Sequence, residues 1–163
     1  NEATQIPQNF IPLSDLSCQK AKSAVEAHFD GPFVVVCPFA TNVHQGQNKE
    51  WPHWNEFVVA YRDKPVLGLV AAQDVARFKK EFPGIPVISE SLSVTAAIMC
   101  EADHVVTNDS GAMHLASFFG AKVTGLLGVT NAVETRPWHG NHLTSVEGKW
   151  STCRDVLDYL SFN

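Results

Sequence analysis

The stretch VVTNDSGAMHLASFFGAKVTGLLG, residues 105–128, determines which fold we expect for this chain. It begins as an apolar run, breaks at Asn108-Asp109-Ser110-Gly111, continues with apolar residues at helical spacing and ends in a second apolar run. We predict a strand over 104–107, a helix over 111–119 and a second strand over 122–127. A strand, a helix and another strand in this order make a βαβ unit with parallel strands.

The same alternation of strands and helices covers most of the chain. Further strands are predicted at 33–37, 65–70, 86–88 and 143–146, and further helices at about 15–29, 51–61, 73–82, 91–100 and 151–160. Such a pattern predicts an α/β fold with a doubly wound, Rossmann-like parallel sheet, because crossover connections are right-handed. We assign residues 1–32 to a linker and a leading helix, and residues 33–163 to the Rossmann-like domain.

The composition is that of one globular domain. Of the 163 residues, 45 % are hydrophobic and 18 % are charged, which excludes a disordered chain. The net charge of −5 argues against a nucleic-acid groove. No apolar run reaches the roughly 18 residues of a membrane span. Cys37 and Cys100 lie in apolar runs, so we expect both to be buried free thiols in a reducing compartment.

Polar residues gather where the predicted strands end. In a doubly wound sheet, ligands bind outside the carboxyl ends of the strands, so residues that follow different strands meet in one crevice. The residues that this rule brings together are Thr41, Asn42, Lys49, Asp109, Ser110, Thr130, Thr135 and Arg136.

The turn at Asn108-Asp109-Ser110-Gly111 has two interpretations. A helix N-terminus offers free N–H groups and a positive dipole end, and with the Ser110 hydroxyl it suits a phosphate, with His114 one turn away. Alternatively, Asp109 or Ser110 only caps the helix and His114 is a buried histidine with its bonds satisfied. The turn by itself leaves both open. A nucleophilic Ser110 is disfavoured because the G-x-S-x-G elbow is missing.

Several common site motifs are missing from the sequence. It contains neither the G-x-G-x-x-G of a dinucleotide-binding fold nor a P-loop, which disfavours NAD and nucleotide-triphosphate chemistry. His139 and His142 have no cysteine or carboxylate at ligand spacing, so we predict no metal site. Lys49 suits a phosphate as a point charge, although a single lysine before a helix is more often simply solvated.

Four stretches, in this order, resemble one known family. They are Pro38 to Thr41 with Lys49-Glu50-Trp51-Pro52, Ser91-Leu92-Ser93 at a helix start, Asn108-Asp109-Ser110-Gly111-Ala112-Met113-His114-Leu115-Ala116, and Gly128-Val129-Thr130 leading to Thr135-Arg136-Pro137-Trp138. The chain resembles the C-terminal, donor-binding domain of the ADP-heptose:lipopolysaccharide heptosyltransferases, glycosyltransferase family 9 of GT-B fold.

The resemblance implies a site for a nucleotide-diphosphate sugar, with ADP-heptose as the first candidate and no metal or other cofactor. It implies that Thr41 and Lys49 meet the donor diphosphate from one wall. Asp74 would hold the ribose, and Glu90 would border the base. The residues implied for the opposite wall of the diphosphate site are Asp109, Ser110, Gly111 and His114.

The resemblance also implies a partner domain. In the family, an N-terminal domain binds the glycan or lipid-linked acceptor and supplies the catalytic base, and these 163 residues do not contain it. We therefore expect an inverting glycosyltransferase in the cytoplasm or at the inner face of the membrane, inactive in this part alone. A nucleotide-sugar-binding module without catalysis is the alternative. A hydrolase that uses Ser110 and His114 is a third, weaker hypothesis.

Overall fold

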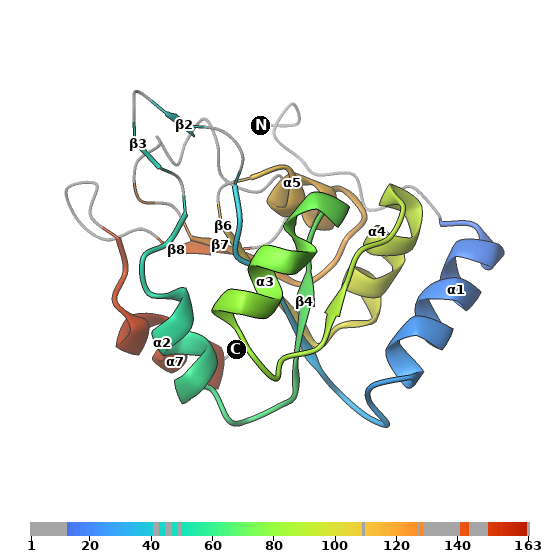
Figure 1. The fold of residues 1–163 in the computed structure, drawn as a ribbon, viewed down its shortest axis with the longest axis horizontal. Coiled ribbons are helices and arrows are strands. Elements are labelled where there is room, and N and C mark those ends of the chain that lie inside the picture. Colours follow the sequence, from blue (N-terminus) through green and yellow to red (C-terminus); the bar gives the residue numbers. More distant parts are fainter. Residues whose placement is uncertain are drawn as a thin grey trace, which may run out of the picture.

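Parallel strands form the central sheet of the protein. The computed structural model describes residues 13–40, 43–44, 47–48, 50–108, 110–126, 128, 141–143 and 150–162. Within these residues the sheet has six strands, in the order β5-β4-β1-β6-β7-β8, and every neighbouring pair is parallel (Figure 1). The strands are β1 (Val34–Cys37), β4 (Val66–Leu69), β5 (Val87–Ile88), β6 (His104–Asn108), β7 (Val123–Leu126) and β8 (Asn141–Leu143).

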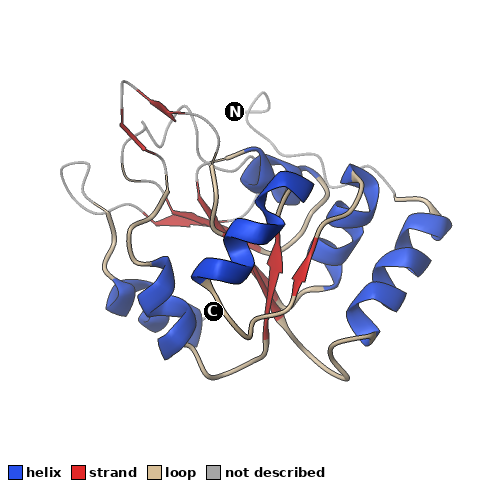
Figure 2. Ribbon diagram, viewed as in Figure 1, coloured by secondary structure: helices blue, strands red, loops and turns tan. Residues whose placement is uncertain are grey.

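Helices cover both faces of this sheet (Figure 2). They are α1 (Asp15–Glu26), α2 (Trp54–Ala60), α3 (Val75–Glu81), α4 (Leu92–Glu101), α5 (Gly111–Phe118) and α7 (Cys153–Phe162). The strand order is that of the Rossmann fold, since the chain first winds from β1 through β4 to β5 and then from β6 outward on the other side. The predicted doubly wound α/β fold is confirmed.

Alternate residues of each strand face opposite layers. In β1, Val35 packs in a core with α1, α4 and α5, whereas Val34 and Val36 pack in a second core with α2, α3 and α7. Val34 to Val36 are at most 1 % exposed. This two-sided burial explains why the strands read as continuously apolar runs rather than as alternating ones.

Serine residues begin two of the helices. The Ser14 hydroxyl accepts a hydrogen bond from the backbone N–H of Ser17 at 3.1 Å, and the Ser91 hydroxyl accepts one from Val94 at 3.4 Å. Each bond satisfies a donor that has no carbonyl partner in the first turn of its helix. The helix starts predicted at about residues 15 and 91 are confirmed.

The structure differs from the predicted elements in a few places. The segment predicted as a polar loop contains a short antiparallel pair, β2 (Val43–His44) and β3 (Gln47–Asn48). The helix predicted over 73–82 starts as a 3-10 turn, η2 (Ala72–Asp74), and the last strand lies a few residues earlier than predicted. The prediction that Cys100 is buried is wrong: Cys100 is exposed at the end of α4, whereas Cys37 is buried. An apolar run through a one-sided helix does not place every member in the core.

A glycine in β4 makes room for an aromatic ring. Gly68 lies opposite the fully buried Phe78 of α3, and a Cβ atom at Gly68 would overlap that ring. We therefore expect Gly68→Ala to lower the free energy of unfolding by about 2 kcal/mol, as overpacked cores do. Urea denaturation measures the change. The double variant Gly68→Ala/Phe78→Leu should lose less than the sum of the single variants, and strict additivity would contradict the overlap.

Candidate functional site

The two halves of the sheet meet between β1 and β6. The chain leaves β1 toward β4 on one side and leaves β6 toward β7 on the other, so the loops after β1 and β6 diverge. Divergent loops leave a crevice at the carboxyl ends of the strands, where doubly wound folds bind ligands.

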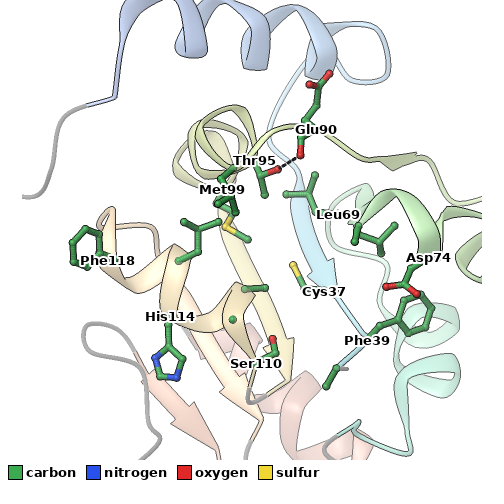
Figure 3. Close-up of a pocket in the computed structure, with 17 residues that line it drawn as sticks. Cys37, Phe39, Leu69, Asp74, Glu90, Thr95, Met99, Ser110, His114 and Phe118 are labelled. Carbon is green, nitrogen blue, oxygen red and sulfur yellow. Dashed lines mark hydrogen bonds between the residues drawn. The ribbon is translucent and has the colours of Figure 1, made fainter. Parts of the chain in front are cut away.

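A cavity of about 640 Å³ occupies this crevice (Figure 3). The loops after β1, β4, β5 and β6, together with α4 and α5, surround it. The lining residues are Cys37, Phe39, Ala40, Leu69, Val70, Ala71, Asp74, Glu90, Leu92, Thr95, Met99, Ser110, Gly111, Ala112, His114, Leu115 and Phe118.

The residues that the sequence singled out converge on this cavity. Those that line it are Asp74, Glu90, Ser110, Gly111 and His114. Of the other candidates, Thr41, Asn42, Lys49, Asp109, Thr130, Thr135 and Arg136 lie outside the described residues. Every predicted site residue that the structure describes therefore borders one cavity, although the residues come from three separate segments, which follow β4, β5 and β6.

Ser110 stands at the N-terminus of α5 without capping it. Its backbone is extended, and its side chain makes no cap hydrogen bond. The Ser110 Oγ is buried and has no hydrogen-bond partner among the described residues. The interpretation of Ser110 as a simple hydroxyl cap is thus wrong. A buried hydroxyl without a partner costs free energy unless some other group satisfies it, and this one borders the cavity.

His114 and Gly111, both on α5, also line the cavity. The alternative that His114 is a buried histidine is wrong, because the residue is exposed and lines the cavity. A Cβ atom at Gly111 would meet no atom within 4 Å, so no packing within the described protein requires a glycine there. The start of α5 therefore offers N–H groups, a hydroxyl and an imidazole to the same space.

Two acidic residues border the cavity on other sides. Figure 3 shows Asp74 beside Phe39 at one side and His114 with Ser110 at the other. The Glu90 carboxylate points away from the other labelled residues, while its main-chain carbonyl accepts a hydrogen bond from the Thr95 hydroxyl at 3.3 Å. Glu90 thus borders the cavity mainly through its backbone.

The rest of the wall is apolar. Leu92 and Phe118 lie at the edge of the cavity and are 75 % and 44 % exposed, which is unusual for such large side chains. Cys37 lies in the floor, where burial raises the pKa of its thiol to about 12. At neutral pH Cys37 is therefore an uncharged, unreactive thiol.

Asn108 fixes the geometry of the crevice, a role that the sequence analysis missed. Its side-chain carbonyl accepts hydrogen bonds from the Trp51 N–H at 2.8 Å and from the Trp54 Nε1–H at 2.9 Å. Its amide donates to the Cys37 carbonyl at 3.4 Å. One fully buried side chain thus ties the end of β6 to the end of β1 and to the start of α2. An asparagine at the end of an apolar strand was the only signal in the sequence.

The described residues show neither a metal cluster nor a membrane span. Nowhere in that part of the chain do three His, Cys, Asp or Glu side chains gather in a way that would hold a metal ion. Among the described helices, none combines the length and the apolar character needed to cross a bilayer.

Comparisons with solved structures identify the same architecture in glycosyltransferases. The structure of E. coli ADP-heptose lps heptosyltransferase II aligns with a TM-score of 0.74 at 20 % identity, over 96 % of this chain and 55 % of that one. E. coli heptosyltransferase WaaC with ADP aligns with a TM-score of 0.68 at 18 % identity, over 97 % and 51 %. A family 9 glycosyl transferase from Veillonella parvula aligns with a TM-score of 0.68 at 18 % identity, over 94 % and 45 %.

Sequence comparison assigns the family. No curated protein sequence matches the chain, whereas the profile described as glycosyltransferase family 9 (heptosyltransferase) matches residues 2–159. The chain spans about half the length of the solved structures that it resembles. The match over nearly all of its residues shows that the chain belongs to glycosyltransferase family 9.

Proposed function

We propose that this chain is the donor-binding half of an inverting glycosyltransferase and that its donor is a nucleotide-diphosphate sugar, ADP-heptose first among the candidates. The observation that carries the proposal is the convergence of Asp74, Ser110, Gly111 and His114 on one cavity at the switch point of the sheet. Family membership and the ADP in the WaaC structure support the choice of nucleotide.

The start of α5 is the proposed diphosphate site. Its backbone N–H groups and dipole favour negative charge. The Ser110 hydroxyl, which has no partner among the described residues, and the exposed His114 ring are donors at the same place. The proposal keeps Lys49, Thr41 and Asp109 as further diphosphate ligands. Asp74 would accept from the ribose hydroxyls.

The other side of the cavity suits an aromatic base. Leu92, Met99 and Phe118 give it a mostly apolar surface that a flat base can contact. The main chain at Glu90 would border the base. When the base binds, it would cover apolar surface of Leu92 and Phe118 that is now exposed to solvent, which favours binding.

The proposed mechanism divides the work between two domains. The acceptor hydroxyl attacks the anomeric carbon directly and the nucleotide diphosphate leaves, so the configuration inverts. The groups at the α5 N-terminus stabilise the negative charge of the departing diphosphate, and no metal is required. A base in the acceptor domain takes the proton. This chain alone would bind the donor and transfer little or nothing. The whole enzyme would act at the inner face of the membrane in lipopolysaccharide or related glycan synthesis.

Gly111→Ala tests the proposal without disturbing the fold. The methyl group meets no protein atom, so the melting temperature should stay unchanged, whereas it would stand where the diphosphate approaches the helix. We expect the dissociation constant for ADP, measured by calorimetry, to rise about tenfold, and His114→Ala to raise it about fivefold.

Gly31→Ala is the matched control, because a Cβ atom there also meets nothing within 4 Å and Gly31 does not line the cavity. It should leave ADP binding unchanged. The absence of any binding of ADP, GDP, UDP or an ADP-sugar at millimolar concentration would refute the proposed function.

A further inference from the structure

An arginine behind the cavity joins two of its wall residues. Arg77, on α3, donates to both carboxylate oxygens of Glu50, at 2.6 and 3.0 Å, and to Glu81 at 2.6 Å. The Arg77 guanidinium also lies over the Phe39 ring, 3.9 Å from its centre. Such a two-pronged pair with an added stacking contact fixes geometry more closely than a single ion pair does.

The Glu50 carboxylate extends this contact to the next wall residue. Its Oε2 accepts a hydrogen bond from the backbone N–H of Ala40 at 3.1 Å. The Glu50 side chain is only 14 % exposed, so its charge needs the partner that Arg77 provides. Ala40 and Glu50 also stand immediately before and after residues 41–49, so this bond joins the two ends of that segment.

Arg77 itself does not line the cavity. Phe39 and Ala40 do, and they are consecutive residues in the wall opposite α5. Arg77 therefore contacts the cavity wall in two ways. Its guanidinium stacks on the Phe39 ring, and it binds Glu50, which in turn accepts the hydrogen bond of the Ala40 N–H.

We infer that Arg77 is a positioning residue for donor binding: with Glu50 it holds the Phe39–Ala40 wall at the spacing from α5 that the nucleotide diphosphate requires. The inference rests on the proposed function, since it concerns the affinity of that same cavity. It assigns a role to a residue that neither lines the cavity nor belongs to a motif of the sequence.

A direct electrostatic role for Arg77 predicts the opposite effect of Glu50→Gln on ADP affinity. If Arg77 attracted the diphosphate directly by its charge, removal of the competing Glu50 carboxylate would strengthen ADP binding. If Arg77 acts by holding the wall through Glu50, the same change weakens ADP binding. Glu50→Gln therefore separates the two roles by the sign of its effect.

The experiment measures ADP binding and amide hydrogen exchange for the parent chain, Arg77→Gln, Arg77→Lys, Glu50→Gln and the double variant Glu50→Gln/Arg77→Gln. We expect Arg77→Gln to raise the dissociation constant about tenfold, and Arg77→Lys to recover little of the loss because lysine has no planar fork. Glu50→Gln should also weaken binding. The double variant should be within about twofold of Arg77→Gln, because both changes break one unit.

Amide hydrogen exchange measures how firmly the Phe39–Ala40 wall is held when no ligand is bound. The Ala40 amide should exchange about tenfold faster in Arg77→Gln, while the amides of β1 keep their protection. Arg154→Gln is the matched control: Arg154 pairs with Asp158 at 3.2 Å on the exposed surface of α7, and both measurements should stay as in the parent.

The possible outcomes separate the two proposals. Unchanged ADP affinity in Arg77→Gln, or stronger binding in Glu50→Gln, would overturn the positioning role while the donor site stands. Failure of the parent chain to bind ADP, GDP, UDP or an ADP-sugar at millimolar concentration would overturn the proposed function and the donor role of Arg77 with it. Unchanged exchange at Ala40 would show that Arg77 does not hold the wall.

Discussion

Asn108→Ala should lower the free energy of unfolding by about 4 kcal/mol, since each buried donor left without an acceptor costs about 1–3 kcal/mol. The substitution removes the acceptor of both the Trp51 N–H and the Trp54 Nε1–H, which are buried at the start of α2. It also removes the link to the end of β1. Because the ends of β1 and β6, which Asn108 joins, border the cavity, ADP binding should weaken with the stability. Urea denaturation followed by tryptophan fluorescence measures the stability.

The control is an asparagine whose hydrogen bond lies at the surface. Asn55 donates to the Glu81 carbonyl at 2.9 Å in an exposed position. Asn55→Ala should cost about 0.5 kcal/mol, because water replaces the lost partner. A loss of less than about 1 kcal/mol for Asn108→Ala would mean that the two tryptophan donors find other acceptors, which contradicts the role assigned to Asn108.

The second large effect is a loss of stability in mild acid, caused by His104. This residue is 4 % exposed, and its Nε2 lies 2.6 Å from the Thr124 hydroxyl. Its pKa falls from the ordinary value of 6.5 to about 4, chiefly because burial disfavours the charged ring and next because Lys122 is near; Lys64 acts in the same direction and Asp103 opposes it.

Between these pH values the unfolded chain binds a proton that the folded chain does not. The stability is therefore complete above about pH 6.5 and falls as the pH is lowered toward 4. At about 1.4 kcal/mol for each pH unit, the loss attributable to His104 is about 2 kcal/mol at pH 5 and about 3 kcal/mol near pH 4.

His104→Gln isolates this contribution, because glutamine still offers a polar group to Thr124 and does not titrate. The difference in stability between the parent and this variant should shrink as the pH falls from 7.5 to 5. An unchanged slope in His104→Gln would show that the His104 ring takes up its proton in the folded state as readily as in the unfolded one.

The sequence predicted the fold because the fold depends on local patterns. Apolar runs such as Val34 to Val36 and the helical spacing after Gly111 each specify an element, and right-handed crossovers leave few ways to join them. The position of the crevice followed from the strand ends alone. For this reason the five described candidates, from loops far apart in the sequence, could be expected at one cavity.

The sequence could not show which side chains support that cavity. The contacts of Asn108 with Trp51 and Trp54 span more than fifty residues, and the pair Arg77–Glu50 spans 27. Nothing in the spacing of these residues distinguishes them from an ordinary strand-end asparagine and a solvated surface charge. The same limit explains the error at Cys100 and why the two interpretations of Ser110 stayed open, since burial and hydrogen bonding depend on neighbours from other elements.

By itself, then, the sequence determined the order of strands and helices, the doubly wound sheet and the edge of that sheet where polar residues gather. Only the tertiary structure decided that the Ser110 hydroxyl has no partner among the described residues, that His114 lines the cavity and that Asn108 and Arg77 make long-range contacts beside it. The physical reason is the distance along the chain over which each kind of interaction acts. Backbone periodicity and turn chemistry act between near neighbours in the chain, whereas hydrogen bonds and burial act between whichever groups the packed elements bring into contact.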